Sequence, residues 1–262
     1  MRSDLSNAKR IVVKIGTNAL MKNNKLNRNL MKQLAEEISS HRRQGKQFVI
    51  VSSGAIGLGL EKLGLNKTDA LPFQQATASV GQSILMREYS KAFDRYNQVV
   101  AQILLTHDVF LDRIQLTTFK NTLNKLMELN VVPIINENDS IAVEELETEK
   151  GFSDNDELAA MVAENFNADL LIIITNVDGL YTDNPQTNSN AQKLSEITDL
   201  KKAREMVSGK SFLGSGGFLS KIDAAEKMSK IGAKTVICSH RKSLLKSLFS
   251  GEVIGSYFFK SN

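Results

Sequence analysis

Short apolar runs alternate along the chain with longer segments in which apolar residues recur every three or four positions. The short runs are apolar at nearly every position, which is typical of strands covered on both faces of a sheet. Parallel strands connected by crossover helices require such coverage. We therefore predict strands at 11–15, 47–52, 98–105, 131–135, 170–175 and 234–238, with a further strand-like run at 253–259.

The longer segments have the periodicity of amphipathic helices. They predict helices over 27–44, 72–93, 114–129, 156–166 and 221–231. Ser220, with Asp223 three residues later, has the spacing of a capping box, and Asp154 with Glu157 repeats it. The predicted fold class is α/β, a three-layer α/β/α sandwich with a mainly parallel central sheet.

The chain is predicted to form a single domain over residues 1–262. This length is compatible with one large α/β domain, and only three prolines leave little room for a rigid linker. The segment 141–153 alternates in character and then becomes charged. We interpret it as an excursion from the sheet, a hairpin or a lid.

Composition narrows the classes of protein to consider. The 33 Lys and Arg residues are scattered along the chain and nearly balanced by 29 Asp and Glu, which argues against nucleic acid as a partner. A single cysteine, Cys238, rules out an internal disulfide framework. No apolar run has the length of a signal peptide or a membrane span, so we expect a cytoplasmic protein with no membrane partner.

Two glycine-containing turns follow the first two predicted strands. Lys14 lies within the first strand, just before Gly16, and a lysine in an apolar strand is costly unless it reaches an anion. An edge lysine that faces water is the alternative. Ser53 and Gly54 follow the second strand and open a helix, where backbone N–H groups can bind a carboxylate or phosphate. An ordinary strand-to-helix turn would look similar.

Two polar clusters are candidates for recognition of a polar ligand. Five consecutive polar residues at 136–140 exceed what a turn needs, and Asp139 among them could hold an ammonium group while Asn136 hydrogen-bonds. The cluster at 153–157 crowds three carboxylates at a helix start, which the helix dipole alone would explain. On the functional interpretation, Asp156 orients catalytic lysines and Asn155 touches the substrate.

A glycine-rich stretch at 214–221 precedes the last predicted helix and ends at Lys221. Glycines permit close approach of the backbone, and the helix N-terminus and lysine favour anions, so the stretch is a candidate triphosphate cradle or else a flexible loop. A Walker A motif is excluded, because the glycine it requires is replaced by Arg204. A Rossmann fingerprint, a zinc-ligand cluster and a G-x-S-x-G elbow are also missing.

Six motifs, taken in order, resemble those of the glutamate 5-kinases, a branch of the amino acid kinase family, and they span essentially the whole chain. They are VVKIGT (12–17), VSSGAIGLG (51–59), VPIINENDSIA (133–142), SDNDELAA (153–160), ITNVDGLYT (174–182) and GSGGFLSK (214–221). INEND and SGAI are the most specific. INEND separates this branch from the carbamate, acetylglutamate, aspartate and uridylate kinases of the same family.

The resemblance implies the fold predicted above and a role for particular residues. The catalytic residues would be Lys14 and Lys221 on the phosphates and Asp156 holding the lysines. The substrate-binding residues would be Ser53, Gly54, Asn136, Asp139 and Asn155. The nucleotide-binding residues would be Lys14, Gly16, Thr175, Asn176, Ser215, Gly216, Gly217, Phe218, Leu219, Ser220 and Lys221.

The sequence departs from the usual pattern of this branch at four positions. Ser153 replaces a common glycine, Asn176 a common aspartate, Ser215 a threonine and Phe218 a methionine. None of these changes removes a charge assigned to catalysis. Many relatives also carry a C-terminal PUA domain, and we expect this chain to be the short form without one.

The resemblance also implies an activity and its partners. The expected reaction is ATP-dependent phosphorylation of the side-chain carboxylate of L-glutamate with Mg²⁺, the first step of proline biosynthesis. It further implies feedback inhibition by proline, transfer of the product to a glutamyl phosphate reductase, and a homodimer or homotetramer. An acetylglutamate or aspartate kinase, or a non-catalytic nucleotide sensor, is the alternative.

Overall fold

A computed structural model of the chain describes residues 2–22, 25–142, 155–183, 185, 187–208 and 215–260, with the backbone alone at 208 and 215–217. The hairpin or lid expected at 141–153 therefore lies outside the described residues from 143 onward. Ser153 and Asp154, and with them the second predicted capping box, also lie outside.

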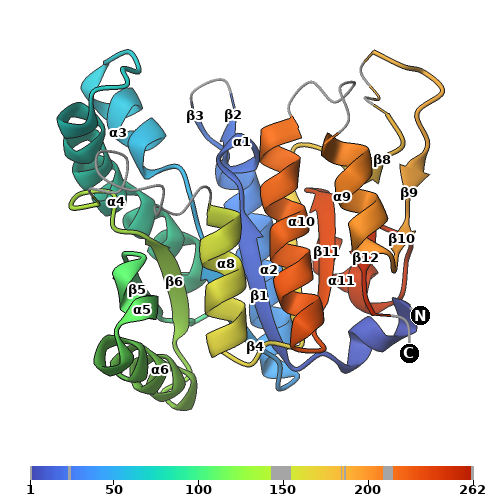
Figure 1. Ribbon diagram of the computed structural model, residues 1–262. Helices are drawn as coiled ribbons and strands as arrows, with labels where there is room; N and C mark the ends of the chain where they lie inside the picture. Colours follow the sequence, from blue (N-terminus) through green and yellow to red (C-terminus); the bar gives the residue numbers. More distant parts are fainter. Residues whose placement is uncertain are drawn as a thin grey trace.

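Eight of the described strands form one sheet (Figure 1). All neighbours in it pair in parallel except β11 and β12, which are antiparallel. The mainly parallel sheet predicted from the apolar runs is thus confirmed. In order across the sheet, the strands are β10 (Glu196–Ile197), β12 (Ser256–Phe258), β11 (Lys234–Ser239), β7 (Leu170–Thr175), β1 (Arg10–Ile15), β4 (Gln47–Val51), β6 (Val132–Glu137) and β5 (Val100–Leu105).

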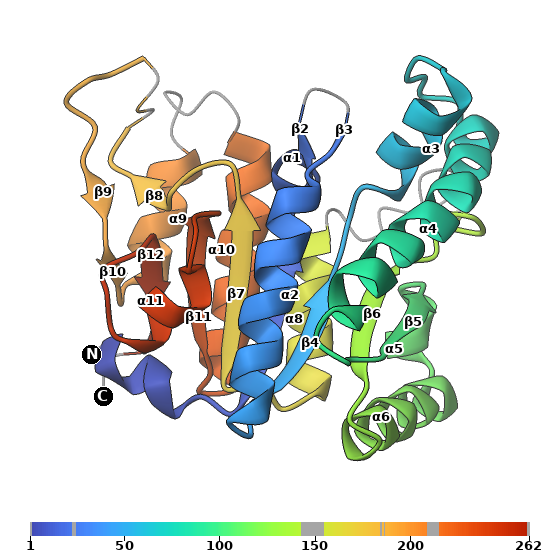
Figure 2. The ribbon, with the colours of Figure 1, turned by 180° about the vertical axis from the view of Figure 1, so that it is seen from behind.

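Helices cover both faces of this sheet, as Figures 1 and 2 show from opposite sides. One face carries α2 (Arg28–Arg43), α3 (Ala55–Leu63), α4 (Leu71–Asp94) and α11 (Leu244–Phe249). The other carries α6 (Arg113–Glu128), α8 (Asn155–Asn165), α9 (Leu200–Ser208) and α10 (Ser215–Lys230). The smaller elements are η1 (Arg2–Asn7), α1 (Thr17–Leu20), α5 (Asp108–Leu111), and the strand pairs β2 (Met21–Lys22) with β3 (Lys25–Leu26) and β8 (Leu180–Tyr181) with β9 (Lys193–Leu194).

The two faces of β1 illustrate why the sheet needs both helical layers. Ile11, Val13 and Ile15 belong to the core cluster under α2, α4 and α11, whereas Val12 belongs to the cluster under α8 and α10. Successive side chains of a strand point to opposite faces, so Lys14 shares the face of Val12. The register of the first strand therefore aims this lysine at α8 and α10.

The last predicted helix begins earlier than its sequence pattern suggested. Helix α10 starts at Ser215, so Ser220 lies inside it and the predicted cap at Ser220 is wrong. The Ser220 hydroxyl instead donates a hydrogen bond to Asp156 Oδ2 at 2.9 Å. Gly216 and Gly217 occupy the first helical turn. Backbone N–H groups of a first turn have no partner within the helix and remain available to a ligand.

Helices α3 and α4 cross with their backbones in contact. A Cβ added at Gly81 would lie 1.7 Å from the Ala55 carbonyl oxygen, and one added at Gly59 would lie 1.8 Å from the Thr77 carbonyl oxygen. Real Cβ atoms cannot approach backbone this closely, so both positions require glycine. The glycines fix the distance between the two helices.

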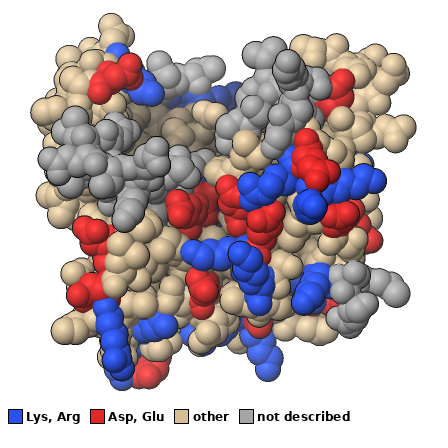
Figure 3. Space-filling view, in the orientation of Figure 1, with Lys and Arg blue, Asp and Glu red and all other residues tan. Residues whose placement is uncertain are grey.

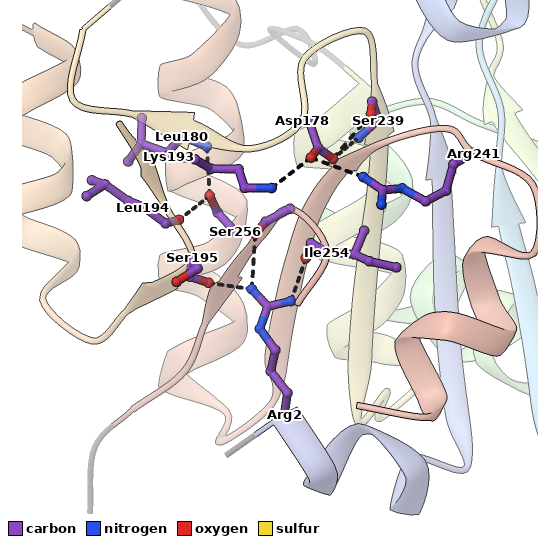
Figure 4. Close-up of polar contacts among 11 residues, drawn as sticks. Arg2, Asp178, Leu180, Lys193, Leu194, Ser195, Ser239, Arg241, Ile254 and Ser256 are labelled. Atoms are coloured by element: carbon purple, nitrogen blue, oxygen red, sulfur yellow. Dashed lines mark hydrogen bonds and ion pairs between the residues drawn. The ribbon is translucent and has the colours of Figure 1, made fainter. Parts of the chain in front are cut away.

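Polar contacts connect the N-terminal segment and the β8–β9 pair to the end of the sheet formed by β10 and β12 (Figure 4). The buried guanidinium of Arg2 donates to the carbonyl oxygens of Ser195, Ile254 and Gly255. Ser256 Oγ accepts from the Leu180 N–H at 2.7 Å. These contacts give hydrogen-bond partners to backbone groups near the edge strand β10.

Charged side chains are interspersed on the face of α8, α9 and α10, where Lys and Arg lie among Asp and Glu (Figure 3). Arg204 on α9, for example, pairs with Glu226 on α10 at 3.0 Å. Among the described helices, none has the length and apolar character needed to cross a membrane.

We predict that Gly81→Ala destabilises the fold, because its new methyl group would overlap the Ala55 carbonyl. Overpacking of this kind lowers the free energy of unfolding by about 1–3 kcal/mol or more. Gly57→Ala in α3 is the matched control, since its nearest neighbour would be Met21 Cε at an ordinary 3.6 Å. Urea denaturation of both variants provides the measurement, and wild-type stability of Gly81→Ala would contradict the close crossing.

Candidate active site

The predicted site residues gather where parallel strands end, at the top of the sheet in Figure 1. Lys14 and Gly16 lie at the end of β1, Ser53 and Gly54 follow β4, and Asn136 lies in β6. Strands β4 and β6 lie on one side of β1, whereas β7 and β11 lie on the other. Ligands of open α/β sheets bind at the carboxyl ends of the strands where the strand order reverses, as it does at β1.

The centre of the site is a buried carboxylate between two lysines. Asp156 in α8 is fully buried, and its Oδ1 lies 2.6 Å from Lys14 Nζ of β1. Its Oδ2 lies 2.8 Å from Lys221 Nζ of α10. Three elements that are distant in sequence thus meet through two ion pairs of one carboxylate. The structure brings together the three residues predicted to be catalytic.

Burial and charge act on Asp156 in opposite directions. Burial opposes ionisation of the carboxyl group, but the charges and hydrogen bonds of Lys14 and Lys221 outweigh it and hold the pKa of Asp156 below its usual value. Only 2% of Lys14 and 7% of Lys221 is exposed. The two ammonium groups are therefore fixed in an environment where their electrostatic effect on a ligand is strong.

Gly16 packs closely beside Lys14 at the end of β1. Its N–H donates to the Ile174 carbonyl at 2.9 Å, and an added Cβ would lie 3.3 Å from that carbonyl oxygen and 3.7 Å from Lys14 Nζ. Ser215, Gly216 and Gly217 begin α10, the helix that carries Lys221. The side chain of Phe218 lies in the hydrophobic core, and the partly buried side chain of Leu219 packs against that core.

A cavity of about 840 Å³ adjoins this centre. Its walls come from α1, the β2–β3 pair, α3 and the residues after it, the first turns of α4 and α8, and the strand ends of β4 and β6. All five residues predicted to bind the substrate line it, namely Ser53, Gly54, Asn136, Asp139 and Asn155. This volume lies within the range of small-molecule sites.

Asn155 at the start of α8 joins three parts of the cavity wall. Its Nδ2 lies 2.9 Å from the Ser52 carbonyl oxygen, 2.8 Å from Ser53 Oγ and 3.1 Å from Asn136 Oδ1. Its Oδ1 is buried and has no hydrogen-bond partner among the described residues. A buried acceptor in a cavity wall is suited to a donor group on a ligand.

Asp139 is the acidic group predicted to face the substrate. Burial raises its pKa to about 6, and one backbone hydrogen bond opposes that shift. Gly54 on the opposite wall has a φ of 90° as the residue that caps α3. Only glycine adopts this conformation readily, so the backbone can turn from β4 into α3 against the cavity.

Thr175 and Asn176 lie at the end of β7, on the other side of β1 from the cavity. Thr175 Oγ1 donates to Asn176 Oδ1 at 3.2 Å. Both side chains are at least partly exposed. The strand order therefore places the predicted nucleotide residues, the lysine centre and the cavity side by side, with the lysines in the middle.

The sequence profile of the amino acid kinase family matches residues 9–239 of the chain. A glutamate 5-kinase of Listeria monocytogenes is 43% identical over 98% of this chain and 95% of its own length. One from Enterococcus faecalis is 40% identical over 99% of this chain and 98% of its own. The chain belongs to the glutamate 5-kinases of the amino acid kinase family.

Solved structures of other members of the amino acid kinase family share the fold. A carbamate kinase from Giardia lamblia bound to AMP-PNP superposes with a TM-score of 0.70 at 18% identity, over 98% of this chain and 100% of the other. A UMP kinase from Ureaplasma parvum gives 0.63 at 16% identity, over 96% and 99%. The three-layer α/β/α sandwich with a mainly parallel sheet that was predicted from the sequence is therefore confirmed.

The sequence patterns did not predict a polar cluster near the end of β7. Asp178, just beyond β7, accepts from Lys193 Nζ at 2.8 Å, from Arg241 Nη2 at 3.1 Å and from Ser239 Oγ at 3.2 Å (Figure 4). Burial raises the pKa of Asp178, but these donors outweigh burial and lower it. An aspartate before a glycine reads as a turn, and only the fold reveals its partners.

We predict that Asp156→Ala destabilises the protein strongly, because it leaves two nearly buried ammonium groups without their shared carboxylate. Removing one partner of a buried ion pair costs about 3–5 kcal/mol. Asp223→Ala is the matched control, since this exposed residue pairs with Arg204 at the surface, where such pairs contribute about 1 kcal/mol or less. The free energy of unfolding measures both, and equal losses would contradict the central role of Asp156.

Proposed function

We propose that the protein catalyses ATP-dependent phosphorylation of the side-chain carboxylate of L-glutamate to give L-glutamyl 5-phosphate. The observation that carries this proposal is that the cavity with its five acceptor-binding candidates adjoins the Lys14–Asp156–Lys221 centre. The relatives named above are glutamate 5-kinases, and they match nearly the whole chain.

The reaction needs positioning and cationic stabilisation more than proton transfer. A glutamate side-chain carboxylate has a pKa of about 4.3 and is already ionised at neutral pH, so it attacks without a general base. Two anionic reactants must be held in line while charge spreads over the transferred phosphoryl group. Lys14 and Lys221, both held by Asp156, would supply positive charge to that group.

Acceptor recognition follows from the polar atoms of the cavity wall. Asp139, as a carboxylate, would bind the α-ammonium group, and the buried Asn155 Oδ1 is a second acceptor without a protein partner among the described residues. Ser53 and Asn136, held by the Asn155 amide, would hydrogen-bond the acceptor and fix its distance from the lysines. Gly54 would offer its backbone.

The nucleotide would occupy the other side of β1. We propose that Thr175 and Asn176 contact the nucleoside, while Gly16, Ser220 and the backbone of residues 215–219 adjoin the phosphates with Lys14 and Lys221. Ser220 Oγ is bound to Asp156 and thus links the first turns of α10 to the charged centre. A helix N-terminus favours the phosphate anions.

Mg²⁺ is proposed to accompany ATP. This ion usually keeps several waters and binds substrate phosphates with one or two carboxylates, and it would neutralise developing charge on the phosphates. Among the described residues, no three His, Cys, Asp or Glu side chains cluster to hold a metal ion. The chemistry of the site fits an ion bound chiefly through phosphate oxygens.

We also propose the cellular context that the family suggests, in which the enzyme is a cytoplasmic homo-oligomer that is inhibited by proline and supplies a glutamyl phosphate reductase. The product is an acyl phosphate, which hydrolyses readily and favours rapid transfer to a reductase. Exposed apolar side chains beside β5, the last strand of the sheet, support self-association: Val99 is 64% exposed and Leu129 is also 64% exposed.

The proposed function is tested by measuring ADP release with Mg-ATP and each of L-glutamate, N-acetyl-L-glutamate, L-aspartate and carbamate. Hydroxylamine traps any acyl phosphate that forms. Turnover with L-glutamate alone is the expected result. Turnover only with another acceptor would agree with the proposed nucleotide site but exclude L-glutamate as the substrate. No turnover with any acceptor would favour a nucleotide sensor.

We predict that Lys14→Ala and Lys221→Ala each lower kcat by about 10²-fold or more, in line with the loss of a donor to the transition state. Lys230→Ala is the control for Lys221, because Lys230 is an exposed lysine at the far end of the same helix. The measurement is kcat from steady-state kinetics on the folded variants. A near-normal kcat in either active-site variant would remove that lysine from catalysis.

We predict that recognition of L-glutamate weakens as the pH falls through the raised pKa of Asp139, about 6. Below that pH the carboxyl group is neutral and cannot hold an ammonium group, so kcat/KM for glutamate should fall about tenfold per pH unit. Asp139→Asn should have a low kcat/KM that lacks this step. A profile in the variant identical to that of the parent protein would exclude Asp139 as the titrating group.

A further inference from the structure

Helix α4 presents a row of polar side chains to the loop that carries Asp139. Gln75, Ser79 and Gln82 are spaced by four and three residues, so they lie along one face of the helix. Gln75 Nε2 donates to the Ala142 carbonyl oxygen at 2.9 Å. The hydroxyls of Ser79 and Ser140 lie 2.9 Å apart. Gln82 Nε2 lies 3.4 Å from the Glu137 carbonyl oxygen.

These contacts bracket Asp139. Glu137 precedes it by two residues, Ser140 follows it directly, and Ala142 lies three residues beyond it. Asp139 lines the cavity, whereas Gln75, Ser79 and Gln82 are not among the residues that line it. The row therefore contacts the loop at residues that flank Asp139 and does not itself line the cavity, although the neighbouring Gln74 of α4 does.

Gln82 is the most deeply buried member of the row. Only 6% of it is exposed, and burial of a side-chain amide is costly unless its polar atoms are paired. Its Oε1 accepts from Gln102 Nε2 of β5 at 3.3 Å, while its Nε2 faces the Glu137 carbonyl. A leucine at this position would fill similar space with no polar group to satisfy. We therefore attribute the side-chain amide of Gln82 to its hydrogen bonds with Gln102 and with the Glu137 carbonyl.

The same helix also sets the opposite wall of the cavity. Its Gly81 contacts the backbone of Ala55, and Ala55, Ile56 and Gly57 of α3 line the cavity. Helix α4 therefore holds the Asp139 loop through Gln75, Ser79 and Gln82, and it holds α3 through the glycine crossing. Both parts of the wall therefore contact the same helix, which is 24 residues long.

We propose that Gln75, Ser79 and Gln82 are positioning residues that set the affinity for the acceptor by fixing the Asp139 loop against α4. This inference rests on the proposed function, since the acceptor is taken to be L-glutamate. None of the three contacts Lys14, Asp156 or Lys221 in any hydrogen bond or ion pair described above. Their loss should therefore act on acceptor binding and spare the nucleotide and the chemical step.

The test is a set of α4 variants, Ser79→Ala, Gln75→Met and the two combined, assayed with L-glutamate and Mg-ATP. Each single variant should raise KM for L-glutamate about 3- to 10-fold, the effect of one lost hydrogen bond. The double variant should raise it further. KM for ATP and kcat at saturating glutamate should stay within about twofold of the parent protein. Ser79→Thr keeps the hydroxyl and should restore the parent KM.

Ser83→Ala is the matched control, because Ser83 is an exposed serine on the same helix that donates to the Val80 carbonyl and does not reach the loop. It should leave KM for glutamate unchanged. An unchanged KM in the double variant would overturn the inference, and so would equal losses for glutamate and ATP, which indicate general loosening. If the parent protein itself shows no turnover with L-glutamate, the proposed function fails and the inference falls with it.

Discussion

The structure depends on one buried carboxylate shared by two lysines. Asp156 joins the central strand β1 to helix α10 through ion pairs of 2.6 and 2.8 Å, and it does so from a third element, α8. Burial of the two ammonium groups is unfavourable in itself, and their attraction to the carboxylate offsets part of that cost. Two ammonium groups against one carboxylate leave the trio with net positive charge. An anionic ligand such as a phosphate chain can compensate that charge, so the arrangement that costs stability is also suited to binding.

The parallel sheet determines what lies on each side of that centre. Because β1 is flanked by β7 on one side and β4 on the other, the nucleotide candidates and the cavity proposed for the acceptor lie on opposite sides of β1. In-line transfer between two anionic reactants requires this kind of separation, with positive charge at the midpoint. Helix α4 contacts two parts of the cavity wall, the loop after β6 through polar side chains and α3 through glycines.

Much of this could be predicted from the sequence because the signals are local. The apolar runs placed the main strands, and the polar residues that follow them placed Ser53, Asn136 and Thr175 at one edge of the sheet. The face of β1 on which Lys14 lies was not predicted, and it follows from the side chains of Ile11, Val12 and Val13 in the structure. The roles assigned to these residues in binding and catalysis were not settled by the fold alone and remain proposals.

The features that the sequence did not predict depend on contacts between distant segments. Ser220 has the spacing of a cap, yet α10 begins at Ser215 and the hydroxyl binds Asp156, 64 residues away. Asp178 reads as a turn residue, but it gathers donors from two other segments. Gly81 and Gln82 lie within a long helix, and nothing in the local pattern tells that one touches a neighbouring backbone and the other a distant loop.

The most direct test of the account is a rapid-quench measurement of a single turnover of phosphoryl transfer in Asp156→Asn, with enzyme in excess over ATP and glutamate saturating. The variant is nearly isosteric, and its fold is checked by circular dichroism. If Asp156 holds the lysines for catalysis, the rate of the chemical step should fall by about 10²-fold or more in the folded protein. A folded variant that transfers the phosphoryl group at the parent rate would contradict the claim that this carboxylate organises the site.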